Sequence, residues 1–128
     1  MHLAAHEKTY LRFPLILLTV ASACAVFFGC EAQVRKSDAE LGLNAQQASG
    51  RRVYDRYCAL CHDAYSARSL KGPSMQAVFK KQFLPSGAPA NDERVREVIN
   101  LGRSKMPSFG NVLTEQQTTD LLAYLHTL

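Results

Sequence analysis

The chain has 128 residues, four cysteines and no tryptophan, and its formal net charge is +4 with the four histidines neutral. This length allows one domain with accessory segments. The positive charge is small and dispersed, with no basic run longer than two residues, so it does not indicate a nucleic-acid-binding protein. It would suit a weak, charge-steered encounter with an acidic protein partner.

Residues 1–30 have the pattern of a targeting segment. Lys8 and Arg12 precede an uncharged and largely apolar stretch over residues 13–30. A basic region followed by an apolar region predicts export across a membrane. The end of the stretch resembles a bacterial lipoprotein signal, in which a small residue precedes the cysteine at the cleavage point, and Cys30 would then be the lipidated first residue of the mature chain.

Three interpretations of this segment stay open. Besides lipidation of Cys30, for which Cys24 is a weaker substitute, the 18 residues could be an uncleaved anchor that just spans an untilted bilayer. The third interpretation is plain cleavage after a small residue. Lipid or helix would hold the protein at the periplasmic face of a bacterial inner membrane, whereas cleavage without lipid would leave it in the periplasm.

Residues 31–43 are polar and small, which predicts a flexible tether between the membrane and a folded domain over residues 44–128. Asn44 and Gln47 have the spacing of a capping box and predict a helix over residues 45–57. Gly50 and Tyr54 lie four residues apart on one face of that helix. A glycine there would permit the close approach of a second helix.

The next segment reads Cys58-Ala59-Leu60-Cys61-His62, which is the C-x-x-C-H spacing of covalent heme attachment. Two thiols at this spacing can add to the two vinyl groups of one porphyrin, and the adjacent imidazole can bind the iron. A redox-active thiol pair and half of a zinc site are the alternatives. Neither has its usual context, because the only other cysteines lie in the first 30 residues.

The middle of the domain alternates loops with short helices. Residues 70–73 are a loop signal, residues 74–83 have the apolar spacing of a short helix, and prolines and glycine exclude a regular element over residues 84–90. Asn91 then predicts the start of a third helix, and Gly102 its end. The buried face of that helix is predicted to comprise Val95, Val98 and Ile99.

Met106 lies in a loop next to Pro107. A thioether is a soft ligand that suits heme iron on the side opposite a histidine. The alternative is that Met106 only fills core space, the commonest role of methionine.

Thr114 and Gln117 form a second capping-box pair and predict a C-terminal helix over residues 115–128. Its apolar band would lie across Gly50 and Tyr54 of the first helix. The band comprises Leu121, Leu122, Tyr124 and Leu125. His126 is expected at the surface.

With these elements in order, residues 44–128 resemble the class I c-type cytochromes. The matching pieces are Gly50-Arg51-Arg52-Val53-Tyr54, the heme motif, Gly72-Pro73, Lys105-Met106-Pro107-Ser108-Phe109, and Leu113-Thr114 leading into residues 121–125. The resemblance implies a small all-α fold of three to five helices around one covalently attached heme c, with the N- and C-terminal helices crossing. It also implies that the carbonyl of Pro73 accepts a hydrogen bond from the ring of His62. Tyr54 stands where many members have phenylalanine.

The resemblance predicts electron transfer rather than catalysis. Cys58 and Cys61 would attach the heme, and His62 and Met106 would ligate its iron from both sides, which leaves no position for a small-molecule substrate. Redox proteins would then be the electron donor and acceptor. Two other functions remain open: a cytochrome subunit of a membrane-bound dehydrogenase or oxidase, and a heme-based ligand sensor. A peroxidase normally needs a second heme, and the sequence has one such motif.

Overall fold

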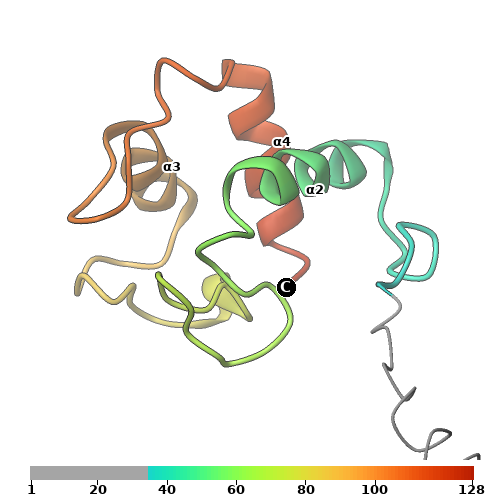
Figure 1. Ribbon diagram of the computed structural model, residues 1–128, viewed down its shortest axis with the longest axis horizontal. Helices are drawn as coiled ribbons and strands as arrows, with labels where there is room; N and C mark the ends of the chain where they lie inside the picture. The colour runs from blue at the N-terminus through green and yellow to red at the C-terminus, as the bar shows by residue number, and fades with distance from the viewer. Residues whose placement is uncertain (1–34) are drawn as a thin grey trace, which may run out of the picture. The chain divides into compact units, whose positions relative to one another are not determined.

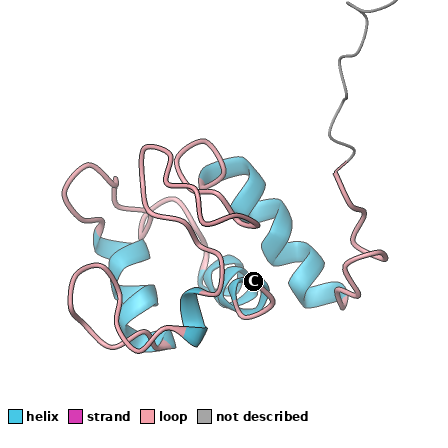
Figure 2. Cartoon of the chain, turned by 90° about the horizontal axis from the view of Figure 1, so that it is seen from below, coloured by secondary structure: helices cyan, strands magenta, loops and turns pink. Residues whose placement is uncertain are grey.

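A computed structural model describes residues 35–128 of the chain. Three α-helices lie in this part, α2 (Ala45–Tyr57), α3 (Asp92–Leu101) and α4 (Glu115–Leu125), together with one 3-10 turn, η1 (Val78–Lys80). Loops connect them, and Figure 2 shows helix and loop without a strand over the described residues. The predicted all-α fold is therefore confirmed. None of the helices in this part of the chain is long and apolar enough to span a membrane.

Local sequence signals start the helices where they were predicted to start. Asn44 caps α2 by accepting a hydrogen bond from the amide of Gln47, whose side chain in turn accepts one from the Asn44 amide. Thr114 and Gln117 form the same reciprocal pair at α4. Each box satisfies two amides that have no partner within the helix, so both helices begin at a defined residue.

Helices α2 and α4 pack directly against each other (Figure 1), as the spacing of Gly50 and Tyr54 predicted. A Cβ atom on Gly50 would lie only 1.8 Å from the backbone oxygen of Asp120, so the two backbones meet at this glycine. The rings of Tyr54 and Tyr124 pack edge to face beside the contact, with centroids 5.5 Å apart. The first and last helices of the described domain therefore meet at this crossing, and the intervening segments connect them.

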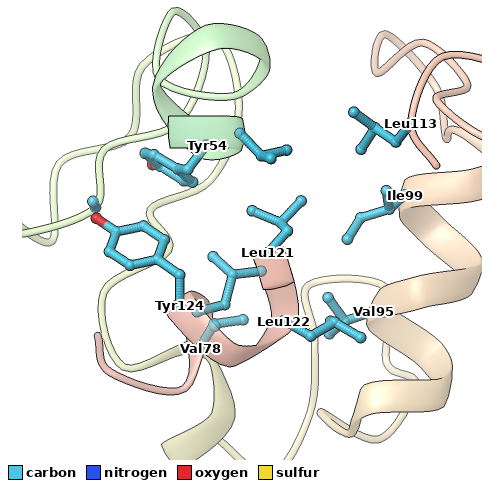
Figure 3. Close-up of a cluster of buried hydrophobic side chains, with 11 residues drawn as sticks. Tyr54, Val78, Val95, Ile99, Leu113, Leu121, Leu122 and Tyr124 are labelled. Atoms are coloured by element: carbon cyan, nitrogen blue, oxygen red, sulfur yellow. The ribbon is translucent and has the colours of Figure 1, made fainter. Parts of the chain in front are cut away.

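The hydrophobic core lies along α4. In Figure 3, Leu121 and Leu122 of α4 stand between the tyrosine pair on one side and Val95 and Ile99 of α3 on the other. Val78 of η1 contributes from a separate loop. The third helix thus presents the predicted apolar face, although Val98 is only half-buried.

The short helix expected over residues 74–83 does not form, and only Val78–Lys80 make a 3-10 turn. Ala77, directly before the turn, has a left-handed backbone with φ of 53°, which interrupts an α-helix. The Ser74 hydroxyl donates to the carbonyl of Ser66, and the Met75 amide donates to the carbonyl of Asp63. Contacts with the preceding loop therefore replace the hydrogen bonds of a helix.

The residues directly before α2 pack onto the folded domain. Arg51 of α2 is buried, and its guanidinium donates to the Asp38 carboxylate at 2.5 Å and to the Lys36 carbonyl at 2.6 Å. Turns with backbone hydrogen bonds from Leu41 and Gly42 follow. A flexible tether was expected over residues 31–43, whereas from Lys36 onward the structure shows a hydrogen-bonded turn.

Candidate functional site

The heme motif begins where α2 ends. The Cys58 amide closes the last turn of the helix by donating to the Tyr54 carbonyl at 2.8 Å. The amides of Cys61 and His62 then both donate to the Cys58 carbonyl, at 3.0 and 2.9 Å. This tight turn places the two thiols and the imidazole in one compact segment. Neither thiol is in a disulfide, and both are half-buried.

Cys58 packs against the core, and burial raises the pKa of its thiol to about 12, with a further contribution from the charge of Asp55. The thiol is therefore neutral at physiological pH. A thioether is neutral as well, so attachment of a vinyl carbon to this sulfur would bury no charge.

The His62 ring is held in a defined orientation. Its Nδ1 atom lies 2.7 Å from the carbonyl oxygen of Pro73. A carbonyl can only accept, so Nδ1 carries the proton and the lone pair of the imidazole is on Nε2. Nε2 is the atom that a metal would bind.

Gly72 provides the space for this ring. A Cβ atom at Gly72 would lie 2.5 to 3.0 Å from three atoms of the His62 ring. Any larger residue would push the imidazole away from Pro73. The Gly72 amide also donates to the Cys61 carbonyl at 2.8 Å, which fastens this loop to the motif.

These features fit a covalently attached heme. Two free thiols at the right spacing are adjacent to a histidine whose proton is tied to a backbone carbonyl, the arrangement by which proteins orient a ligating imidazole. The described residues contain no group of three or more His, Cys, Asp or Glu side chains arranged to hold a metal ion.

Met106 comes from a different loop, which follows α3. Gly102 ends α3 with φ of 72°, and Ser104 also has a positive φ of 55°. Backbone hydrogen bonds in both directions between Arg103 and Met106 close the turn at 3.0 and 2.9 Å. The Met106 side chain is half-buried and packs against the core. His62 follows α2 and Met106 follows α3, so the two side chains come from separate loops.

Sequence reasoning missed two contacts near the motif. The Tyr54 hydroxyl donates to the backbone carbonyl of His62 at 2.7 Å, and burial raises the pKa of this phenol so that it keeps its proton. The hydroxyls of Tyr65 and Tyr124 are 2.6 Å apart. Neither contact follows from a spacing rule, because the partners lie on separate segments.

The other residues singled out in the sequence either lie at the protein surface or fall outside the described part of the chain. Five basic side chains of the loops and of η1 are all exposed, and Lys80 donates to the Leu128 carbonyl at 3.0 Å. They are Lys71, Lys80, Lys81, Arg103 and Lys105. His126 is at the surface as expected, but it also contacts Asp92 at 2.6 Å and stacks on Phe79. Cys30 lies outside the described residues.

Comparison with known proteins finds a family model and relatives that match this chain. Residues 45–125 match the family model described as cytochrome c oxidase, cbb3-type, subunit III. The chain is 29% identical over 83 residues to cytochrome c6 of Rippkaea orientalis, covering 65% of this chain and 71% of the relative. It is also 29% identical over 82 residues to cytochrome c6 of Chlorolobion braunii, covering 64% and 90% respectively.

Among solved structures, cytochrome c6 from the diatom Phaeodactylum tricornutum aligns with a TM-score of 0.48 and 22% identity, covering 62% of this chain and 88% of that one. The family model spans more than half of the chain and includes the whole site from α2 to α4. The chain therefore belongs to this family: it is a class I c-type cytochrome that carries one covalently attached heme c and functions in heme-based electron transfer.

Proposed function

We propose that Cys58 and Cys61 form the two thioether bonds to the heme and that His62 and Met106 are its axial ligands. The observation that carries this proposal is the 2.7 Å contact between His62 Nδ1 and the Pro73 carbonyl. It fixes the tautomer that leaves Nε2 for the iron. The half-buried Met106 thioether on the loop after α3 supports the second ligand, since it is one of two methionines in the described part of the chain.

With both axial positions filled by this chain, the protein acts as an electron carrier and not as an enzyme. Heme c, when bound, supplies a one-electron iron couple. His62 and Met106 would exclude substrates from the iron, and the thioether of Met106 would favour the ferrous state. Redox proteins would donate and accept the electrons, and the exposed basic side chains favour an acidic partner.

Replacing Met106 tests this ligand set. Met106→Leu conserves volume and apolar character, so it should keep the fold while it removes the sulfur. We expect the reduction potential to fall by roughly 100 mV or more and the reduced protein to bind carbon monoxide, because axial ligation sets heme potentials over a range of about 0.8 V. Met75→Leu is the matched control and should change neither property.

An unchanged spectrum and potential in Met106→Leu would refute the proposed ligand. Rapid carbon monoxide binding by the unmodified reduced protein would instead favour a ligand sensor, because it would show an open position on the iron.

A second candidate is a cytochrome subunit of a membrane-bound oxidase, which the description of the matching family favours. The chemistry of the site would be the same, but the electron partner would be permanent. Mild detergent extraction followed by affinity purification of the full chain distinguishes the two functions. Stoichiometric recovery of an oxidase would support the subunit, and recovery of the cytochrome alone would support the free carrier.

We further propose that residues 1–30 direct export, that Cys30 carries the lipid, and that residues 31–43 join this anchor to the domain over residues 44–128. The basic and apolar order of the sequence supports periplasmic placement at the inner membrane. Mass spectrometry of the mature protein tests it. A mature chain that begins with lipidated Cys30 is the expected result. An intact N-terminus would instead support the uncleaved anchor, and an unlipidated cleavage product would support the soluble form.

A further inference from the structure

Two tyrosine hydroxyls connect the crossing of α2 and α4 to the segment directly after the heme motif. The hydroxyl of Tyr54 in α2 donates to the His62 carbonyl at 2.7 Å. The hydroxyl of Tyr124 in α4 lies 2.6 Å from that of Tyr65. Tyr54 and Tyr124 also contact each other, with ring centroids 5.5 Å apart. One buried aromatic pair therefore holds the chain at two positions, three residues apart.

The two tyrosines suit this role because they are rigidly placed. Both are almost fully buried, and Tyr124 is fully enclosed beside the Gly50 contact. A buried phenol must find a hydrogen-bond partner, and here each partner lies on the loop that bears the ligand. Tyr65 is 47% exposed, and the contact of its hydroxyl with Tyr124 adds to the hydrogen bonds that Ser74 and Gln76 donate to this loop.

His62 is consequently held at both ends. Tyr54 fixes its backbone carbonyl, and Pro73 fixes its ring through Nδ1. A single ring contact would let the imidazole rotate together with a shifting backbone. With the backbone fixed as well, both the position and the plane of the ring are determined relative to the helix crossing.

We propose that Tyr54 and Tyr124 are positioning residues, which set the orientation of His62 toward the heme iron by tying its loop to the α2–α4 crossing. This inference rests on the proposed role of His62 as an axial ligand. It adds the proposal that packing at the helix crossing influences the electronic state of the iron through the orientation of His62.

The test uses the full-length, heme-loaded protein with Tyr54→Phe, which keeps the ring and removes only the donor. Tyr57→Phe is the matched control on the same helix, because Tyr57 packs on Phe109 through its ring and makes no hydrogen bond through its hydroxyl among the described residues. Tyr65→Phe tests the second contact from its half-exposed side, and it leaves the buried Tyr124 hydroxyl without this partner.

Two readouts separate positioning from simple stability. The paramagnetic NMR shifts of the heme methyl groups in the ferric state report the plane of the axial imidazole, and they should change in Tyr54→Phe but not in Tyr57→Phe. Hydrogen exchange of the Gly72 and Met75 amides, which donate to the carbonyls of Cys61 and Asp63, should accelerate roughly tenfold, the scale of one lost hydrogen bond. Amides within α3 should keep their rates.

Methyl shifts and exchange rates in Tyr54→Phe that match those of Tyr57→Phe would overturn the inference while leaving His62 as the ligand. Uniformly faster exchange, α3 included, with unchanged methyl shifts would also overturn it, since that pattern is a loss of global stability. A parent protein whose NMR spectrum shows no histidine bound to the iron would overturn this inference and the proposed function together.

Discussion

The close approach of two helices at Gly50 makes one substitution unusually informative. In Gly50→Ala the new Cβ atom would lie 1.8 Å from the Asp120 backbone oxygen and 2.9 Å from Tyr124 Cβ. The first of these partners is backbone and cannot rotate away. The helices would have to separate by roughly 1 Å or more to restore ordinary contact. That shift would loosen the buried ring pair beside the crossing.

Two opposing effects decide whether Gly50→Ala raises or lowers the free energy of unfolding. Alanine is a better helix former than glycine by about 1 kcal/mol. Overpacking in a well-packed core costs about 1–3 kcal/mol and sometimes more, and the loss of ring contacts adds to this cost. We therefore expect the free energy of unfolding to fall by about 2–4 kcal/mol. For a domain of this size the melting temperature should fall by about 10–25 °C.

Thermal and guanidinium unfolding of the heme-loaded protein, followed by far-ultraviolet circular dichroism, measures this loss. Gln46→Ala on the exposed side of α2 is the control and should change stability by less than about 0.5 kcal/mol. Adding Asp120→Ala should not restore stability, because the clash is with the backbone. A Gly50→Ala protein as stable as the parent would refute the close-packing argument, since the helix-propensity effect would then have prevailed.

Two further substitutions test the segments that flank the crossing. Asp38→Ala leaves the buried guanidinium of Arg51 without its carboxylate. We expect it to lower the free energy of unfolding by about 1–3 kcal/mol, a modest value because the Asp38 side chain is 40% exposed. An unchanged midpoint of urea unfolding would show that this ion pair contributes nothing to stability. Gly102→Ala combines a positive φ of 72° with a Cβ atom 2.6 Å from the Met106 carbonyl oxygen. It should lower the free energy of unfolding by about 1–3 kcal/mol and weaken the absorption band of methionine bound to iron. Gly87→Ala is the control, because Gly87 also has a positive φ but open space around it, and it should leave that band intact. Equal bands in both glycine variants would contradict the second expectation.

Features set by neighbouring residues were predictable from the sequence. The capping boxes at Asn44 and Thr114 involve partners three residues away, so the starts of α2 and α4 followed directly. The crossing at Gly50 was also predictable, because a glycine and an aromatic on one helical face had a matching apolar band at the C-terminus.

Features set by distant segments were not predictable. Apolar spacing indicated a helix over residues 74–83, but the hydroxyl of Ser74 and the amide of Met75 bind the preceding loop instead. The burial of Arg51 on Asp38 followed from no local spacing, because Asp38 lies 13 residues earlier in the chain. The hydrogen bond of the Tyr54 hydroxyl was not predictable either, because its acceptor is the backbone carbonyl of His62 on a loop whose path the sequence does not specify.

The measurement that tests the central claim most directly is the absorption spectrum of the heme-loaded protein, oxidised and reduced, with carbon monoxide added to the reduced form. Ligation by His62 and Met106 predicts the weak far-red band of methionine bound to ferric iron, together with a reduced spectrum that carbon monoxide does not alter. Absence of that band, combined with rapid carbon monoxide binding, would contradict the account, because the iron would then be open to exogenous ligands and Met106 would only fill space in the core.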